Sequence, residues 1–593
     1  MNEAFLPVSK EECREREIWQ LDFIVVSCDA YVDHHSFGHA IIARLVESQG
    51  FTVGIIPQPV SDEDFSRLGA PRHAFLVSGG VVDSMVNNYT VARRRRTSDV
   101  YSEGGRFGRR PDRALTVYTR ALKRLFPDVP VIIGGIEASL RRFSHYDYWS
   151  DSVMHSVLYD SGADLLIYGM GENPILELCA MAKRKKPLGR LRNIRGTAYM
   201  TDLAAAPGDI AEAIGGKNVA GVTVLSSHER VKSDKKIYAK AFLTQYRNTD
   251  PFSADVLVQK QDNTRYVVVN RPALPLDEKQ MDFVYALPFA RAPHPMYKDG
   301  VPAIEEVKFS VTAHRGCFGN CAFCALTYHQ GRIVTPRSEK SILEEVERIA
   351  ADPDFKGYIH DIGGPSANLH NPACDKQKTA GVCRDRECIG YKPCPNLKVD
   401  QSAYLSVLRK ARSIKGVKKV FIRSGLRFDY MLYDKDRTFL RELVRHHISG
   451  QLKVAPEHVA DNVLKTMNKP PHALYEKFCA EYAKCNAEAG KRQYLVPYLI
   501  SSHPGCTLSD AVDLAKYLKK IGYCPEQVQD FYPTPGTLAT TMYYTGLDPR
   551  TMQPIYVARD PHEKAMQRAL MQYRNPKNRA FIEEALKITG KTL

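Results

Sequence analysis

Short apolar runs alternate with helical patterns through the first 170 residues, and most of the runs end in glycine. Residues 21–27, 51–56, 73–77, 129–133 and 163–168 are rich in β-branched and aliphatic side chains, as buried parallel strands are. Glycines follow at Gly79-Gly80, Gly134-Gly135 and Gly169-Met170-Gly171-Glu172. Strands that alternate with helices predict an α/β fold with a doubly wound parallel sheet. Its ligand crevice is expected at the carboxyl ends of the strands.

A second series of strands and helices occupies the middle of the chain. Strands are predicted near residues 305–312, 357–362, 417–423, 452–457, 493–501 and 527–532, with helices between them. Proline-rich sequence with one hairpin and one helix separates the two series. We therefore predict a doubly wound domain at 1–214, a connector at 215–300, a second α/β domain at 301–545 and a carboxyl-terminal extension at 546–593.

Three cysteines, Cys317, Cys321 and Cys324, fall within eight residues in the spacing C-x3-C-x2-C. Thiolates this close together on a tight loop can ligate three irons of a 4Fe–4S cluster. The fourth iron then has no protein ligand, and an open metal position is where a substrate or cofactor binds. Three reduced core thiols, or three ligands of a zinc ion whose fourth ligand lies elsewhere, are the alternatives.

Four further cysteines lie on a polar loop just after the second strand of this domain. They are Cys374, Cys383, Cys388 and Cys394, with spacings of x8, x4 and x5. Four thiols on one loop suit an all-cysteine metal site, either a second iron–sulfur cluster or a structural zinc. Uncoordinated thiols in a flexible loop are the alternative.

Composition limits the class of protein. The 593 residues include 14 cysteines, and the amino-terminal stretch carries charges throughout, with no apolar secretory segment. No uncharged apolar run approaches the length of a membrane span. We therefore expect a cytoplasmic protein with reduced thiols and no membrane partner.

The net charge of +16 is concentrated in part at Arg93-Arg94-Arg95-Arg96, Arg106, Arg109, Arg110 and Arg113. Such a stretch is compatible with RNA as a partner. Pyrophosphate cofactors, acidic proteins and solubility explain it equally well.

The cysteine spacing, with an aromatic residue before the last cysteine, resembles the radical S-adenosylmethionine (SAM) superfamily. Longer stretches resemble its YgiQ-type family, whose reaction is unassigned. They are Asp29-Ala30-Tyr31-Val32-Asp33-His34, Gly134-Gly135-Ile136-Glu137-Ala138-Ser139, His314-Arg315-Gly316-Cys317, Asp361-Ile362-Gly363-Gly364-Pro365, Ala455-Pro456-Glu457-His458 and Asp530-Phe531-Tyr532-Pro533. The resemblance covers nearly the whole chain.

This resemblance implies a fold and a set of cofactor contacts. The middle domain is expected to be a partial (β/α)6 TIM-like barrel with its active site at the carboxyl ends of the strands. Gly363 and Gly364 match the glycine turn that seats SAM, although Pro365 stands where a glutamate often follows. Arg423 and Ser424, at the end of a later strand, are candidates for binding the ribose or carboxylate of SAM.

The amino-terminal domain resembles the cobalamin-binding domain that precedes many radical SAM barrels. Its pattern D-x-H-x-x-G is matched by residues 33–38. The resemblance makes His35 the candidate cobalt ligand and Asp33 the partner that orients it. A cofactor-free version of the same fold is the alternative.

Together these features predict a radical SAM enzyme. Its 4Fe–4S cluster reductively cleaves SAM to a 5′-deoxyadenosyl radical that acts on an unknown substrate, with electrons from a reductant such as flavodoxin or ferredoxin. The alternatives are a cobalamin-dependent radical SAM methyltransferase, an RNA-modifying enzyme and a non-enzymatic iron–sulfur redox sensor. No individual catalytic residue is predicted.

Overall fold

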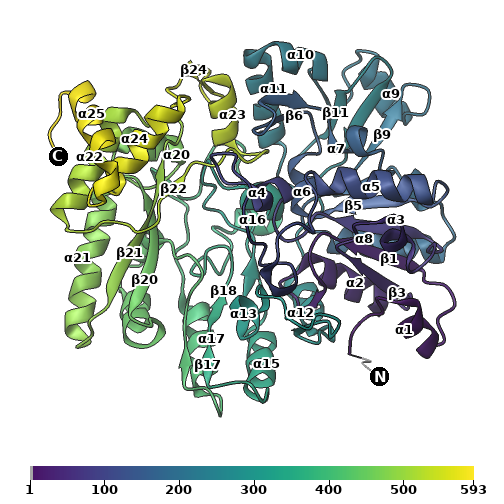
Figure 1. Ribbon diagram of the computed structural model, residues 1–593, viewed down its shortest axis with the longest axis horizontal. Helices are drawn as coiled ribbons and strands as arrows, with labels where there is room; N and C mark the ends of the chain where they lie inside the picture. The colour runs from purple at the N-terminus through teal and green to yellow at the C-terminus, as the bar shows by residue number, and fades with distance from the viewer. Residues whose placement is uncertain (1–3) are drawn as a thin grey trace. The chain divides into compact units, whose positions relative to one another are not determined.

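The computed structural model describes residues 4–593 and divides into two compact units (Figure 1). The first comprises Met1–Lys308 and Tyr328–Gln330, and the second comprises Phe309–Thr327 and Gly331–Leu593. Both are α/β in composition, as expected from the two series of strands and helices.

A mixed sheet of nine strands forms the centre of the first unit within the described residues. Its parallel part has the order β3 (Val53–Pro57), β1 (Phe23–Ser27), β4 (Ala74–Ser78), β5 (Val131–Gly134) and β8 (Leu165–Ile167). The chain leaves β1 toward β3 and then returns to β4 on the other side. The topological switch point therefore lies between β1 and β4.

Four more strands extend the sheet beyond β8. They are β9 (Thr197–Asp202), β12 (Arg265–Val269), β11 (Val256–Lys260) and β10 (Val222–Leu225). The predicted hairpin is present as the antiparallel pair β11–β12. Three of these strands come from the segment 215–300 that the sequence predicts as a connector, so that segment is an integral part of the sheet. Its attachment depends on the distant strand β9, which local patterns did not indicate.

Helices cover both faces of the parallel strands, and every residue of β1 is buried. Alternate side chains enter two different cores. Ile24 and Val26 pack with residues of α5 (Ala114–Leu125), whereas Phe23 and Val25 pack with residues of α2 (Gly38–Ser48) and α8 (Glu172–Lys183). Burial on both faces explains why these strands are continuous apolar runs.

Short parallel pairings in chain order characterise the second unit. Strand β14 (Ser310–Thr312) pairs with β18 (Asp361–Gly363), and β17 (Tyr358–Ile359) pairs with β19 (Lys419–Val420). Leu426 then bridges to Val454 in β20 (Gln451–Glu457), which continues to β21 (Tyr494–Ser501) and β22 (Gln529–Asp530). Helices α15 (Glu339–Ala350), α17 (Ser402–Ser413), α21 (His472–Glu488) and α22 (Leu508–Lys520) alternate with these strands.

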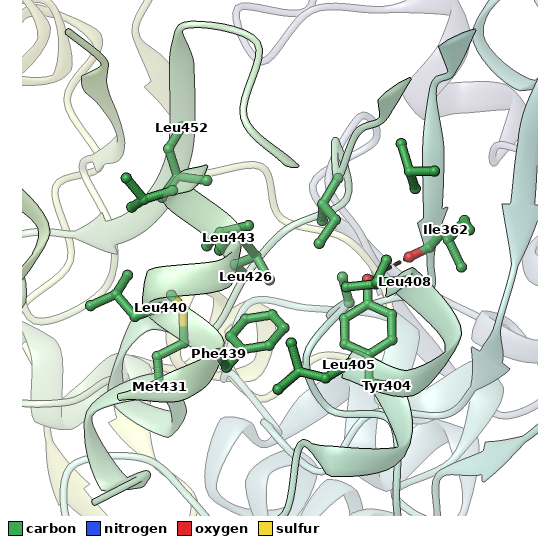
Figure 2. Packing of buried hydrophobic residues seen from close by; sticks show 14 of the residues in the cluster. Ile362, Tyr404, Leu405, Leu408, Leu426, Met431, Phe439, Leu440, Leu443 and Leu452 are labelled. Atoms are coloured by element: carbon green, nitrogen blue, oxygen red, sulfur yellow. Dashed lines mark hydrogen bonds between the residues drawn. The ribbon is translucent and has the colours of Figure 1, made fainter. Parts of the chain in front are cut away.

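Figure 2 shows part of the core of the second unit. Leu405 and Leu408 of α17 gather with Phe439, and with Ile362 of β18. The hydroxyl of Tyr404 donates to the carbonyl of Ile362. This packing holds β18, and the loops at its carboxyl end, in place.

The carboxyl-terminal helices α24 (Pro561–Met571) and α25 (Arg579–Thr589) pack on α22. The side chain of Gln567 accepts a hydrogen bond from the amide of Ser502 (3.1 Å), and Arg568 forms an ion pair with Asp530 at the end of β22. The extension is therefore joined to the strand ends of the second unit. Among residues 4–593, no helix combines the length and apolar character that crossing a bilayer requires.

Candidate metal centre

The loop that carries Cys317, Cys321 and Cys324 follows directly from the first strand of the second unit. The short antiparallel pair β15 (His314–Arg315) and β16 (Thr335–Pro336) closes its base, and the amide of Cys317 donates to the carbonyl of Gly331 at 3.2 Å. Gly316 has a φ of 82°, and a Cβ at this position would lie 2.0 Å from the carbonyl oxygen of Ile333. Only glycine fits there, so the turn into the cysteines is fixed by packing.

All three thiols are partly buried, and their charges interact. Burial raises the pKa of the Cys317 thiol, and a negative charge on Cys321 raises it further. Burial raises the pKa of Cys324 to about 12, with added contributions from charge on Cys321 and Cys317. Without a metal these thiols are held in the neutral form, and binding of iron would release their protons.

Donors surround these sulfurs. The amide of Gly319 donates to Cys317 Sγ (3.4 Å), and the Ser366 hydroxyl lies 3.7 Å from the same sulfur. Across residues 4–593, no three His, Cys, Asp or Glu side chains converge on one ion position. A 4Fe–4S cluster does not require such convergence, because each thiolate binds a different iron.

Arg427 is a fixed cation against this loop. Its Nη1 donates to Cys321 Sγ at 3.5 Å, while Nε and Nη2 donate to the Asp429 carboxylate at 2.9 and 2.6 Å. Asn368 exchanges two hydrogen bonds with the Arg427 backbone. The side chain is nearly buried, and its charge lowers the pKa of Cys317. Arg427 therefore offsets part of the burial that raises the pKa of the Cys317 thiol.

Glu457 ends strand β20 with a φ of 69°, an uncommon conformation for a side chain of this kind. Its carboxylate is buried and lies 3.7 Å from Lys469 Nζ. Burial raises the pKa of Glu457, and its charge contributes to raising that of Cys324. Strain of this type at a strand end often accompanies function. Sequence reasoning noted the position of Glu457 but gave it no role, and it did not single out Arg427.

The predicted SAM-binding residues meet at one edge of the parallel strands. Asp361 accepts from the amides of Arg423 (2.8 Å) and Ser424 (3.2 Å) and from the Ser424 hydroxyl. Arg423 is exposed. The Ser424 hydroxyl is already used by Asp361.

The two predicted glycines are required by close packing. A Cβ on Gly363 would lie 1.9 Å from Ser424 Oγ, and one on Gly364 would lie 2.6 Å from His314 Nε2. The Gly363 carbonyl accepts from the amide of Ala313 at 2.7 Å. Their presence therefore has a structural explanation, whether or not they also contact a cofactor.

The second set of cysteines is partly exposed on the loop between β18 and α17. Burial raises the pKa of Cys388 to about 11, and charge on Cys374 and Cys394 adds to this. Glu387 joins this loop to the first cysteine loop, because its carboxylate accepts from Asn320 Nδ2 (2.7 Å) and Arg332 Nη2 (3.0 Å).

Asp33 and His35, the candidate cobalamin residues of the first unit, do not form the expected pair. Asp33 is fully buried and forms an ion pair with Arg44. His35 is also buried, its Nε2 lies 3.0 Å from Arg291 Nη1, and the ring packs edge-on against Tyr285 at 5.0 Å. The Arg291 guanidinium is hydrogen-bonded to His35 Nε2, the ring nitrogen that would bind cobalt. These residues therefore do not fit a cobalamin ligand set.

The switch point of the first unit is filled by the chain itself. Arg110 is buried and donates to Asp29 (2.6 Å), to Asp99 (3.2 Å) and to the carbonyl of Gly79 (3.0 Å). A Cβ on Gly80 would lie 2.4 Å from the Asp29 carboxylate. The crevice that the strand pattern predicts as a ligand site holds an internal ion network.

Much of the basic stretch is neutralised in the same way. Arg95, Arg106 and Arg113 form ion pairs with acidic residues of the same unit. At several positions the positive charge of the stretch is therefore paired within the protein. RNA binding by this stretch stays a prediction.

Comparison with known proteins identifies the family. A family model described as "Radical SAM N-terminal" matches residues 5–310, and one described as "Domain of unknown function (DUF3362)" matches residues 526–592. A UPF0313 protein of Clostridium botulinum (strain Loch Maree / Type A3) is 54% identical over 99% of this chain and 89% of its own. A UPF0313 protein of Clostridium perfringens (strain ATCC 13124) is 53% identical over 99% and 88%.

The chain belongs to the UPF0313 family of radical SAM proteins. The predicted YgiQ-type resemblance is thereby confirmed, as is the prediction of a radical SAM enzyme of unspecified reaction. A 4Fe–4S cluster and SAM are the cofactors of this class.

Two solved structures resemble the chain at low similarity. The radical SAM methyltransferase TsrM from Kitasatospora setae, solved with cobalamin and a [4Fe-4S] cluster, has a TM-score of 0.46 and 12% identity, covering 87% of this chain and 74% of its own. The cobalamin-dependent SAM radical enzyme OxsB has a TM-score of 0.47 and 9% identity, covering 97% and 73%. Similarity at this level carries no argument about cofactor or reaction.

Proposed function

We propose that Cys317, Cys321 and Cys324 hold the 4Fe–4S cluster of a radical SAM enzyme and leave one iron open for SAM. The observation that carries this proposal is the contact of the buried Arg427 guanidinium with one of three mutually repelling thiols. The guanidinium pairs with the buried Asp429 carboxylate and also donates to a sulfur of the loop. It stabilises the charge that three thiolates bring to a cluster.

The bound cluster would supply an electron that cleaves SAM to a 5′-deoxyadenosyl radical. The protein positions the cofactors and excludes water. Phe318 is fully buried between the first two cysteines and packs against Tyr430, so it shields one side of the loop. The Gly319 amide and the Ser366 hydroxyl donate toward Cys317 and tune the charge on its sulfur.

We place SAM at the carboxyl ends of the parallel strands, and we interpret these strands as a partial (β/α)6 barrel. Their parallel pairing in chain order supports this interpretation. Arg423 is exposed and therefore available to the carboxylate or ribose of SAM. Glu457, strained and near Cys324, is the best placed carboxylate to receive a polar group of SAM or substrate.

The electron donor we propose is a small one-electron carrier of the flavodoxin or ferredoxin class. A cytoplasmic setting suits such a donor and the free thiols. The substrate stays unassigned.

Anaerobic reconstitution of the full chain tests the proposal. With dithionite and SAM, the wild type is expected to form 5′-deoxyadenosine, and Cys317→Ala/Cys321→Ala/Cys324→Ala is expected to form none. Cys479→Ala, which removes a partly exposed thiol on α21, is the matched control and should behave as the wild type. Equal product from the triple variant, or zinc in place of iron in the wild type, would contradict the assignment.

A further inference from the structure

The loop at residues 364–401 combines length with little regular structure. In this fully described stretch the regular element is α16 (Lys376–Thr379), a helix of 4 residues. Loops of this length without secondary structure are uncommon in compact domains unless they serve a function. Yet the loop is built against the rest of the unit and not extended into solvent, as its contacts show.

Its apolar core is small. Phe318, Val334, Leu369, Ala373, Ile389 and Tyr430 form a separate cluster, with Cys317 and Cys388 partly buried at its edge. So few apolar side chains provide limited stabilisation for so long a segment. Small cores of this kind usually rely on a covalent or metal cross-link. All four cysteines of the loop are free thiols, so a disulfide does not supply one.

The cysteines gather around α16. Cys374 lies directly before α16, where the amide of Gln377 donates to the carbonyl of Cys374 at 3.2 Å. The amide of Cys394 donates to the carbonyl of Cys388 at 2.9 Å, which closes the second half of the loop. These backbone hydrogen bonds fix the positions of three of the four cysteines within the folded loop.

Two side chains of α16 point donors at these sulfurs. Lys376 Nζ lies 3.4 Å from Cys383 Sγ, and Gln377 Nε2 lies 3.4 Å from Cys388 Sγ. The oxygen of the same Gln377 amide accepts from the amide of Ala373 at 2.9 Å, which fixes its orientation. Hydrogen bonds to sulfur are one of the means by which proteins stabilise the charge of iron–sulfur clusters. This is the chemistry already seen around the first cysteine loop.

The loop is also clamped to the first cysteine loop. Arg332 donates to the carbonyls of Cys383 (3.1 Å) and Arg386 (3.0 Å), and to the carboxylate of Glu387. Gly390 approaches Asn468 so closely that a Cβ would lie 2.1 Å from its Oδ1, and Asn468 Nδ2 donates to the carbonyl of Asn320. The two sets of cysteines are therefore neighbours in one rigid assembly of loops.

We propose that Cys374, Cys383, Cys388 and Cys394 ligate a second 4Fe–4S cluster. The loop is hydrogen-bonded to the first cysteine loop, where a redox-active cluster can exchange electrons and a zinc ion cannot, and this favours iron–sulfur over zinc. With four protein thiolates, every iron of this cluster is ligated, so it has no open position for SAM or substrate. Its roles are to cross-link the loop and to carry one electron at a time.

Iron and acid-labile sulfide counting on the full chain, combined with Mössbauer spectroscopy, tests this proposal. After anaerobic reconstitution the wild type is expected to contain about eight irons and eight sulfides, four for each cluster. Cys317→Ala/Cys321→Ala/Cys324→Ala is expected to retain about four, because it leaves the second site intact. Cys374→Ala/Cys388→Ala should also retain about four, and Cys479→Ala/Cys524→Ala should retain the full content.

The triple variant, Cys317→Ala/Cys321→Ala/Cys324→Ala, leaves the loop at residues 364–401 unchanged. It therefore tests the second site even where the loop variant, Cys374→Ala/Cys388→Ala, fails to fold. Loss of all iron from the triple variant would overturn the second cluster, as would one zinc per chain that the loop variant lacks. A third outcome would separate the two proposals: about four irons in the wild type, the same iron in the triple variant, and none in Cys374→Ala/Cys388→Ala. That result would contradict the proposed function and support the second site.

Discussion

The two units end their parallel strands in different ways. In the first unit, the carboxyl edge is closed by buried ion pairs of the chain itself, with Arg110 between Asp29 and Asp99, and Arg44 on Asp33. In the second unit, the corresponding edge carries cysteines, an exposed Arg423 and a strained Glu457. Both edges contain buried ion pairs, Arg427–Asp429 and Lys469–Glu457 in the second unit, but only the second edge also carries the three clustered cysteines and an exposed arginine at the strand ends.

This difference separates a structural role from a chemical one. Removing one partner of a buried ion pair lowers the folding stability of the protein. Removing an exposed charged side chain that binds a ligand lowers ligand affinity and leaves folding stability nearly unchanged. Matched substitutions in the two units can therefore distinguish the two roles.

The largest expected effect on stability is at the switch point of the first unit. Arg110→Met leaves Asp29 and Asp99 buried without their cation, and we expect the free energy of unfolding to fall by about 3–5 kcal/mol. Urea denaturation measures it. The adjacent Arg109 is exposed, and Arg109→Met should stay within about 0.5 kcal/mol of the wild type. Equal, small effects of both changes would mean that the crevice is not held by this network.

A smaller effect is expected at the charged neighbour of the first cysteine loop. Arg427→Met combined with Asp429→Asn removes the cation without leaving a buried carboxylate unpaired. We expect cluster affinity to fall by about 10–100-fold, as for other groups that contact metal ligands. The reduction potential should also fall, since the reduced cluster loses a nearby positive charge. Iron titration and anaerobic redox titration measure these changes; an unchanged potential would remove Arg427 from the site.

Arg423 should affect binding and leave stability unchanged. Arg423→Ala is expected to raise the KM for SAM about tenfold, the loss of one charge-assisted hydrogen bond of about 1.5 kcal/mol. Its free energy of unfolding should change by less than about 0.5 kcal/mol, because the side chain is exposed. Lys419→Ala, an exposed cation on β19, is the control. A KM equal to that of the wild type would place SAM elsewhere.

The smallest effect concerns a buried carboxylate in the first unit. Burial raises the pKa of Glu137 above its ordinary value of 4.5, although the amides of Ser84 and Leu115 donate to it. The native state therefore holds this proton to higher pH than the unfolded state, and the contribution of Glu137 to stability falls as pH rises from about 4.5 through the raised pKa. Glu137→Gln should show a shallower loss of stability over that range in denaturation at several pH values. A steeper loss of stability with pH in the variant than in the wild type would mean that the pKa of Glu137 is lowered by folding and not raised.

Local patterns were sufficient for the strands of the parallel sheet, because runs such as Phe23–Ser27 are buried on both faces and are therefore apolar throughout. They were insufficient for β10, β11 and β12, whose place in the sheet depends on pairing with β9. The sequence predicted the β11–β12 hairpin but not its pairing with β9. Non-local pairing leaves little trace in a single sequence.

The candidate site likewise contains residues that local sequence predicts and residues that only the fold brings together. Cysteine spacing makes Cys317, Cys321 and Cys324 the candidate ligands, since ligands on one loop are close in sequence. Arg427 contacts Cys321 from more than a hundred positions away, and nothing in its own surroundings in the sequence marks that contact. The D-x-H-x-x-G pattern shows the converse case, because Asp33 matches the pattern in sequence and is paired with Arg44 in the fold.

The most direct test of the open iron is electron paramagnetic resonance of the dithionite-reduced, reconstituted full chain with and without SAM. Because the proposed cluster on these three cysteines leaves one iron without a protein ligand, SAM is expected to change the spectrum of the reduced cluster, and Cys317→Ala/Cys321→Ala/Cys324→Ala is expected to show no such change. A reduced iron–sulfur signal in the wild type that SAM leaves unaltered would contradict the account.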